Sequence, residues 1–264
     1  MILAIDAGGT FLKSAVQKTN GIVMQLQEIP VCSDGTAEEI GTAFRSVVQA
    51  AERTGGSPVT GMAVCIPGPF DYRTGEFRMD HKFRSVKGRS IREFLPEQPI
   101  VFVHDANAFL MGIPEWDQGR VGGITLGTGL GAAAAINGVC QNNEAQTPLY
   151  PLWNRPFRGG IAEDYVSTRA LLKAFPQAKT VKEMVGLPGT TDIWKQFGTA
   201  LAELLTDWKE ELSLDRIVIG GGISRAKDFF LVPELSRLPI EFHTAGNPAL
   251  TGLFDEYNRR RKEQ

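Results

Sequence analysis

Two hydrophobic patterns recur along the 264 residues: short apolar or alternating runs, typical of strands, and longer stretches with an apolar residue every three or four positions, typical of helices. The clearest helix follows Thr36, because Glu39 completes a capping box and Gly55 and Gly56 end the apolar stripe. Strands are predicted at residues 2–6, 12–17, 22–31, 59–66, 100–103, 132–136 and 216–219 and from residue 121. Further helices are predicted at residues 106–111, 161–175 and 198–212, after residue 222, and from residue 248 to the end.

One arrangement occurs twice: a strand, a glycine-rich turn containing a threonine, and a second strand. The first turn is Ala7-Gly8-Gly9-Thr10 and the second is Gly127-Thr128-Gly129. This repetition predicts two similar lobes that face each other across a cleft. The expected divisions are an N-terminal lobe at residues 1–106, a C-terminal lobe at 107–247, and a helix at 248–264 that packs back on the first lobe.

Composition narrows the class of protein. The chain is 42% hydrophobic and 22% charged, which is ordinary for a globular protein, and its formal net charge of −2 favours neither nucleic acid nor an anionic membrane as a partner. No apolar run approaches the roughly 20 residues that span a bilayer, and the N-terminus lacks the basic region of a signal peptide. Cys32, Cys65 and Cys140 are too widely spaced for a disulfide framework or a metal site, which favours the cytoplasm.

The two glycine-rich turns suit phosphate binding. Glycines let consecutive backbone N–H groups approach and surround an anion, and Thr10 and Thr128 each add a hydroxyl donor. Asp6 ends the strand before the first turn, where its carboxylate could hold a hydrated Mg²⁺ that bridges phosphates. A single such turn would more simply be a plain hairpin, but the preceding Asp and the second turn favour a nucleotide site.

Other phosphate-binding schemes do not fit. No G-x-x-x-x-G-K-[ST] sequence occurs, so a P-loop is excluded. The glycines at 127–131 lack the G-x-G-x-x-G spacing of a dinucleotide fold and precede a strand rather than a helix.

Asp105 is the candidate general base, because it follows a buried strand at the position where open α/β sheets bind ligands. The alternative is that Asp105 only N-caps the helix that follows. The segment Gly220-Gly221-Gly222 also follows a strand, where a flat adenine or ribose ring could approach the backbone. Its alternative is a tight turn without a ligand.

These residues, in this order, resemble the ROK family of bacterial sugar kinases and repressors, within the hexokinase/actin/heat-shock-70-like fold. The matching segments are Asp6–Thr10, Ile66–Asp71, His104–Ala108, Thr125–Gly131 with Asn137-Gly138, and Ile217–Ile223. The resemblance implies an α/β protein with two actin-like ATPase (ribonuclease H-like) lobes and a central cleft. It also implies transfer of the γ-phosphate of ATP to a sugar hydroxyl, commonly the 6-hydroxyl of a hexose, with Asp105 as base, and a homodimer.

The resemblance further assigns the two sides of the site. ATP and Mg²⁺ would be bound by Asp6, Gly8, Gly9, Thr10, Gly127, Thr128, Gly129, Gly220, Gly221 and Gly222, with Asp6 as the metal ligand. The sugar would be bound by Gly68, His104, Asn107, Glu144 and Glu163.

The departures from the family pattern lie on the sugar side. The family's zinc-binding His and Cys residues are missing from residues 143–157, so no zinc is expected, and prolines and aromatics could order this loop instead. Thr147 stands where the family has a His, and Glu163 fits a sugar-binding Glu better than Glu144 does. His104 replaces an Asn that touches the sugar, and it offers one hydrogen bond where an amide offers two. Alternatively, His104 is bonded within the fold.

Three rival functions remain. A ROK repressor would carry an N-terminal DNA-binding domain, which is not expected here because the chain starts on the first strand. A non-catalytic sugar or nucleotide sensor would have little reason to retain Asp105. An actin-like polymer former usually needs longer insertions. The basic end at residues 259–262 is expected to complement a helix C-terminus rather than bind nucleic acid.

Overall fold

A computed structural model describes residues 1–263, and the chain divides into two compact units. Unit 1 comprises residues 1–112, residues 142–147 and the chain from Asn247 onward. Unit 2 comprises residues 113–141 and 148–246. The chain therefore passes between the units four times, and it returns to unit 1 at Asn142 and at Asn247.

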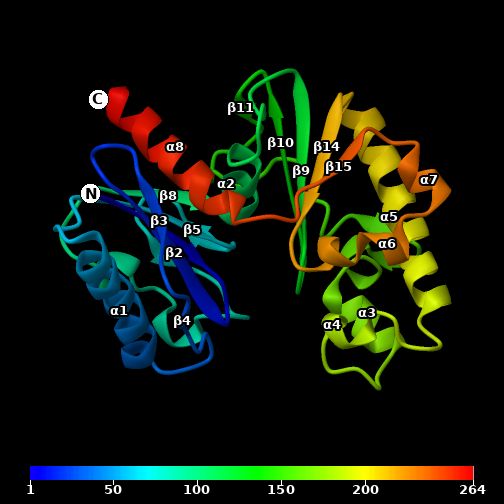
Figure 1. Cartoon of the computed structure of the whole chain (residues 1–264), viewed down its shortest axis with the longest axis horizontal. Helices are drawn as coiled ribbons and strands as arrows, with labels where there is room; N and C mark the ends of the chain where they lie inside the picture. The colour runs from blue at the N-terminus through cyan, green and yellow to red at the C-terminus, as the bar shows by residue number, and fades with distance from the viewer. Residues whose placement is uncertain (264) are drawn as a thin grey trace. The chain divides into compact units, whose positions relative to one another are not determined.

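Unit 1 is built on a mixed sheet with the strand order β3-β2-β1-β5-β8 (Figure 1). β2 pairs antiparallel with β1, β3 and β4, whereas β5 runs parallel to both β1 and β8. The elements of this unit are β1 (Ile2–Ala7), β2 (Phe11–Gln17), β3 (Val23–Gln25), β4 (Ile29–Pro30), α1 (Ala37–Gly55), β5 (Gly61–Ile66), β6 (Phe70–Asp71), β7 (Glu76–Phe77), η1 (Arg84–Val86), η2 (Ile91–Phe94), β8 (Ile100–His104), α2 (Asp105–Met111) and α8 (Pro248–Lys262).

The two faces of this sheet carry side chains of different size. Leu3, Ile5 and Val64 belong to the hydrophobic cluster that includes the buried side of α1. Alternate positions on β1 and β5 carry small residues, and α8 packs against these strands, as its Tyr257 does at Gly61. Because successive side chains of a strand point to opposite faces, this alternation sets which helix each face receives. Figure 1 shows α1 on one side of the sheet and α8 on the other.

Local signals predicted α1 well. Thr36 is the N-cap, Thr36 and Glu39 form both bonds of the capping box, and Gly56 closes the helix in the left-handed conformation. The prediction of one strand at residues 22–31 was wrong, because this stretch forms two short strands, β3 and β4, that pair separately with β2. The run has strand propensity throughout, but its pairing with β2 is interrupted between Gln25 and Ile29.

Helices α2 and α8 approach so closely that only glycine fits at two positions. A Cβ at Gly112 would lie 1.7 Å from the carbonyl oxygen of Pro248, and one at Gly252 would lie 2.2 Å from that of Ala108. Such contacts bring the two backbones together without intervening side chains. They fix the helix that begins at Asp105 against the last helix of the chain.

Unit 2 contains a second sheet, with the order β11-β10-β9-β14-β15. β9, β10 and β11 are antiparallel neighbours, and β14 runs parallel to β9 and β15, so the strand senses repeat those of unit 1. The predicted repetition is therefore present in the sheet topology. The elements are β9 (Arg120–Leu126), β10 (Leu130–Ile136), β11 (Val139–Cys140), β12 (Pro156–Phe157), β13 (Gly160–Ile161), η3 (Ala162–Asp164), α3 (Thr168–Ala174), α4 (Val181–Met184), α5 (Thr191–Leu212), β14 (Arg216–Gly220), η4 (Ile223–Ala226), α6 (Lys227–Phe230), α7 (Pro233–Ser236) and β15 (Ile240–Phe242).

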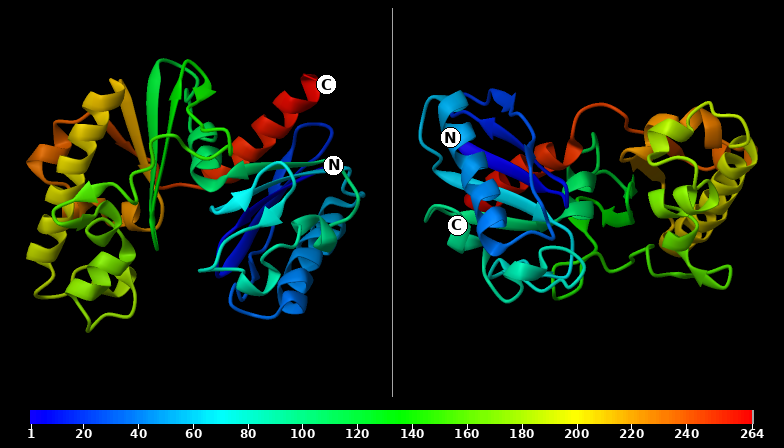
Figure 2. Two further views of the ribbon diagram at one scale, coloured as in Figure 1. Left: turned by 180° about the vertical axis from the view of Figure 1, so that it is seen from behind. Right: turned by 90° about the horizontal axis from the view of Figure 1, so that it is seen from below.

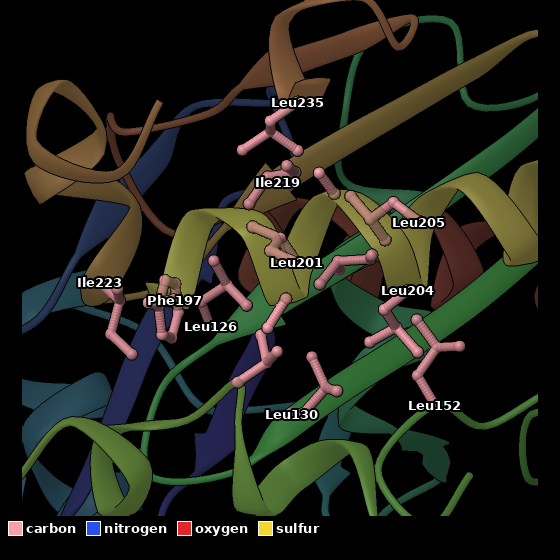
Figure 3. Close-up of a cluster of buried hydrophobic side chains, with 14 of the residues drawn as sticks. Leu126, Leu130, Leu152, Phe197, Leu201, Leu204, Leu205, Ile219, Ile223 and Leu235 are labelled. Atoms are coloured by element: carbon pink, nitrogen blue, oxygen red, sulfur yellow. The ribbon is translucent and has the colours of Figure 1, made fainter. Parts of the chain in front are cut away.

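The core of unit 2 lies between its sheet and α5, and Figure 2 shows α5 beside the sheet from two directions. In Figure 3, Leu126 and Leu130 of the sheet lie in one cluster with Phe197 and Leu201 of α5. These two leucines flank the turn at residues 127–129. The glycine-rich turn is therefore anchored by a buried side chain on each side.

Two predictions for unit 2 need correction, and a third is supported. The helix expected at residues 161–175 begins only at Thr168, after β13 and η3, and α5 begins at Thr191 rather than at 198. In the segment from residue 137 to 160, Leu152 and Phe157 are buried in the core, so apolar packing does order this loop. Within residues 1–263, the structure contains no helix long and apolar enough to cross a membrane.

The contact between α2 and α8 makes a testable prediction. Gly252→Ala should lower the free energy of unfolding by about 3 kcal/mol, because the added methyl group must displace a neighbouring backbone. The exposed Thr251→Ala on the same helix is the matched control and should change it by less than about 0.5 kcal/mol. Urea denaturation followed by circular dichroism measures both. Equal stabilities of the two variants would contradict the tight contact.

Candidate active site

The residues with predicted chemistry in unit 1 meet at one edge of its sheet. β1, β5 and β8 are parallel, with Asp6 paired to Cys65 and Ile66 paired to His104. Their carboxyl ends therefore lie side by side, which is where open α/β sheets bind ligands. This edge brings together Asp6, the turn that contains Gly68, and His104-Asp105.

Asp6 is held by two donors. The Asn247 amide donates from Nδ2 to Oδ2 at 2.9 Å, and the Cys65 thiol donates to Oδ1 at 3.5 Å. Burial raises the pKa of Asp6, and the negative charge of Asp105 adds to this rise, whereas the bonds from Asn247 and Cys65 and the charge of Lys13 oppose it. Burial also raises the pKa of Cys65, which keeps the thiol protonated as a donor.

Asp105 is the first residue of α2, and its side chain is 41% exposed. Its Oδ1 accepts a hydrogen bond from the Ala106 N–H at 2.8 Å. The alternative that Asp105 is the N-cap is wrong, because His104 occupies that position and its Nδ1 accepts from the same N–H at 3.2 Å. Asp105 therefore has a carboxylate oxygen that no hydrogen bond within residues 1–263 engages.

The fold determines which tautomer His104 adopts. Burial lowers the pKa of His104, against a smaller opposing effect of Asp105, so the ring is neutral at neutral pH. Nδ1 accepts from the Ala106 N–H at 3.2 Å and lies 3.1 Å from Asp105 Oδ1, and the first of these contacts favours the tautomer with its proton on Nε2. Nε2 faces Gly68, where an added Cβ would lie 3.8 Å away. The two interpretations of His104 therefore each describe one nitrogen: Nδ1 is bonded within the fold, and Nε2 has no hydrogen-bond partner within residues 1–263.

Tyr72 supports the turn beside His104. Its hydroxyl donates to the Ile66 carbonyl at 2.9 Å, and its ring centroid lies 5.8 Å from that of His104. Burial raises the pKa of Tyr72, so the hydroxyl stays a donor. Sequence reasoning missed this residue, because a tyrosine after a Pro-Gly-Pro turn carries no signal of its own.

Asn107 faces inward. It is 3% exposed, and its Nδ2 donates to Asn142 Oδ1 at 2.8 Å, while its own Oδ1 has no hydrogen-bond partner among residues 1–263. Asn107 thereby holds the segment that returns to unit 1 at residues 142–147. Glu144 lies in this segment and is exposed. Its backbone carbonyl accepts a hydrogen bond from the Arg73 side chain at 3.3 Å.

The first glycine-rich turn is short and open to solvent. The Gly8 N–H donates to the Phe11 carbonyl at 3.2 Å, and a Cβ at Gly8 would lie 3.0 Å from the same oxygen. Thr10 is exposed, and its carbonyl accepts from the Val31 N–H at 2.9 Å. Gly9 lies next to Lys82. A Cβ added at Gly9 would lie 3.3 Å from side-chain carbons of Lys82.

Glu163 holds the second glycine-rich turn, at residues 127–129. Its Oε2 accepts from the Leu130 N–H at 2.8 Å, and its Oε1 pairs with Arg169. A Cβ at Gly129 would lie 2.5 Å from Oε2, so glycine is needed there for the carboxylate to approach. Gly127 has open space around it, and Thr128 is exposed. Glu163 therefore contacts the phosphate-type turn directly.

The turn at residues 220–222 lies beside this one, because β9 and β14 are parallel neighbours and Gly220 pairs with Thr125. Gly221 has φ +89°, and a Cβ there would lie 2.4 Å from the Leu126 carbonyl oxygen. Gly222 has nothing within 4 Å of an added Cβ. Only Gly221 is required by the backbone, so Gly222 leaves space that the fold itself does not use.

Within residues 1–263, no three or more His, Cys, Asp or Glu side chains are grouped so that they could hold a metal ion. Asp6 is a lone carboxylate. Such a ligand suits a cation that keeps most of its water molecules, as Mg²⁺ does.

The sequence profile of the ROK family matches residues 2–145. The chain belongs to the ROK family. It is 28% identical to an N-acetylmannosamine kinase from Vibrio vulnificus, over 86% of this chain and 85% of that protein. The family and the names of its relatives indicate an ATP-dependent sugar kinase.

Solved structures share the fold. A ROK-family glucokinase from Streptomyces griseus in complex with glucose and AMPPNP matches with a TM-score of 0.77 at 19% identity, over 97% of this chain and 98% of that one. A ROK-family transcriptional regulator, described as a homologue of the E. coli MLC protein, matches with a TM-score of 0.76 at 16% identity, over 97% and 77%. The predicted actin-like ATPase fold is confirmed, and this fold occurs in both kinases and regulators.

The neutral His104 makes a prediction about acid stability. Because its folded pKa lies below the unfolded value of about 6.5, the unfolded state binds more protons as pH falls, and stability is lost below that pH. His104→Asn removes this effect and keeps an N-cap residue. The variant should therefore lose less stability than the wild type between pH 7.5 and pH 5, as measured by urea denaturation. Parallel losses would show that His104 is not held neutral.

Proposed function

We propose that this protein transfers the γ-phosphate of ATP to a hydroxyl group, the 6-hydroxyl, of a hexose or hexose derivative, with Asp105 as general base. One observation carries the proposal: the Asp105 carboxylate, whose side chain is 41% exposed, lies at the same sheet edge as half-buried Asp6 and the Gly68 turn. The membership of this protein in the ROK family supports the same chemistry.

Asp105 has the properties of a base for a hydroxyl. Its Oδ1 is oriented by the Ala106 N–H, while Oδ2 can accept a proton. The attacking hydroxyl loses its proton as the bond to phosphorus forms, and a positioned carboxylate that accepts this proton contributes about 10²- to 10⁴-fold in rate. Most of the remaining acceleration in phosphoryl transfer comes from positioning and neutralisation of charge.

Glycine-rich turns and Asp6 are the residues proposed to bind the nucleotide. In unit 1, Gly9 and Thr10 would offer N–H and hydroxyl donors to phosphate oxygens, while the Gly8 N–H closes the turn by donating to the Phe11 carbonyl. In unit 2, residues 127–129 offer the same, and the open space at Gly222 suits adenine or ribose. Asp6 would hold Mg²⁺, which neutralises phosphate charge when bound; its donors Asn247 and Cys65 each engage one oxygen and leave lone pairs for the ion.

The sugar side is proposed to centre on Gly68 and His104. The Nε2–H of His104 would donate to a sugar oxygen, and the missing side chain of Gly68 leaves the space for it. Glu144 has an exposed position from which a carboxylate could accept from sugar hydroxyls. Glu163 could do so only after exchanging its bond to Arg169, and Asn107 would act through Asn142.

The predictions about the lobes, the location in the cell, the oligomeric state and zinc remain part of this proposal. The two units would be the lobes expected for the family, with the division near residue 106. The protein would work in the cytoplasm as a homodimer, without zinc.

Asp105→Asn tests the base. The amide can still accept the Ala106 N–H bond but cannot take a proton, so kcat should fall by about 10²-fold or more while ATP affinity stays within about twofold. A coupled ADP-release assay and titration calorimetry measure the two quantities. A variant that keeps more than about a tenth of the wild-type kcat would remove Asp105 from this role.

Gly68→Ala and Gly222→Ala form a matched pair, since neither Cβ would clash with the protein. Gly68→Ala should raise the KM for sugar about tenfold with little change in the KM for ATP, because the methyl group fills acceptor space. Gly222→Ala should do the reverse. Unchanged melting temperatures would show that neither effect is structural, and an effect of Gly68→Ala on ATP alone would contradict the assignment.

The decisive experiment is an acceptor screen with Mg·ATP across hexoses and N-acetylhexosamines, followed by NMR of the phosphorylated product to identify the hydroxyl. Turnover of one sugar class supports the proposal. Binding of Mg·ATP without turnover of any acceptor would instead favour the non-catalytic sensor.

A further inference from the structure

Asn247 stands at the point where the chain returns from unit 2 to unit 1. It is the N-cap of α8, with an extended backbone at φ −129° and ψ 93°, and its Oδ1 accepts from the Ala249 N–H at 3.1 Å. Pro248 occupies the first helical position and has no N–H, so Ala249 supplies the first donor that needs a cap.

The cap determines which end of the amide faces Asp6. An asparagine offers an acceptor at one end and donors at the other. Because Oδ1 is engaged by the helix backbone, Nδ2 must point away from the helix, and it donates to Asp6 Oδ2 at 2.9 Å. The orientation is thus fixed by two bonds that agree with each other.

Asn247 is the stronger of the two donors on Asp6. The Cys65 thiol is a weak donor, and its sulfur lies 3.5 Å from Oδ1. Asn247 is also held firmly, because the first turn of α8 packs on Gly112 and Gly252 packs on Ala108. A carboxylate with one oxygen bonded to a fixed amide has only limited freedom to rotate.

We propose that Asn247 is a positioning residue that aims the Asp6 carboxylate toward the Mg²⁺ of Mg·ATP. The proposal rests on the proposed function and adds a residue to it. Asn247 itself contacts neither ion nor nucleotide. Asn247 joins the start of α8 to Asp6 by a hydrogen bond, so that the oxygens of Asp6 are already oriented before Mg·ATP binds.

The chemistry of the cap allows this role to be separated from helix stability. Ser and Asp cap helices about as well as Asn does. Ser cannot reach Asp6 with a donor, and Asp would put a second carboxylate against the first. Asn247→Ser therefore removes positioning alone, Asn247→Asp opposes it, and Asn247→Ala removes the cap as well.

The test measures binding of Mg·ATP, and of ATP in excess EDTA, by titration calorimetry on the full-length protein, together with melting temperatures. Asn247→Ser should weaken Mg·ATP binding about tenfold and Asn247→Asp more, with little change in binding of ATP in EDTA. Asn247→Ser should melt close to the wild type, whereas Asn247→Asp should melt lower because two carboxylates repel each other, and Asn247→Ala should melt lower because the cap is lost.

The outcomes are distinguishable. Wild-type affinity for Mg·ATP in both Asn247→Ser and Asn247→Asp would overturn the positioning role and leave Asn247 as a helix cap. Equal weakening with and without Mg²⁺ would also overturn it, because the effect would then not pass through the metal ligand. A wild-type protein that binds no Mg·ATP at all would contradict the proposed function itself.

Discussion

The close packing of α8 on unit 1 is the constraint on which the candidate site depends. Gly61 makes room for Tyr257, and Gly112 and Gly252 bring the backbones of α2 and α8 into contact. A larger residue at any of these positions would move α8 away from the sheet. Since Asn247 is the N-cap of α8 and bonds Asp6, the position of this carboxylate is set by helix packing rather than by its own strand alone.

Burial then gives the two carboxylates of this edge different properties. Asp6 is half-buried, and a carboxylate that loses hydration without gaining donors is costly, so its bonds to Asn247 and Cys65 offset part of the lost hydration. Asp105 lies at a helix start with its side chain 41% exposed and one oxygen unengaged. Two aspartates at one sheet edge, one at the end of β1 and one at the start of α2, thereby suit the different tasks proposed for them, one to hold a cation and the other to accept a proton.

In unit 2, a different set of residues holds the glycine-rich turn at residues 127–129 in place. Its glycine-rich turn is anchored by Leu126 and Leu130 in the core and by Glu163 beneath it. Its glycines also differ in purpose: Gly221 and Gly129 are needed for backbone conformation or close approach, whereas Gly222 is not. A glycine that the fold does not require is the better indicator of a ligand, which is why Gly68 and Gly222 serve as test positions.

The sequence by itself determined the features that depend on neighbouring residues. The capping box of Thr36 with Glu39, the turns that follow β1 and β9, and the placement of Asp105 after an apolar strand all follow from local hydrogen bonding and periodicity. From these, the repeated sheet plan and most candidate residues could be predicted.

Only the tertiary structure decided which residues distant in sequence are hydrogen-bond partners. Asn247 and Asp6 are 241 residues apart, and nothing in an Asn-Pro pair indicates that its amide will meet a carboxylate. The same holds for Glu163 against the turn at Leu130, and for the division of residues 22–31 into two strands. Hydrogen-bond partners distant in sequence are chosen by how helices and strands pack, and that packing depends on the whole set of side-chain volumes rather than on any local pattern.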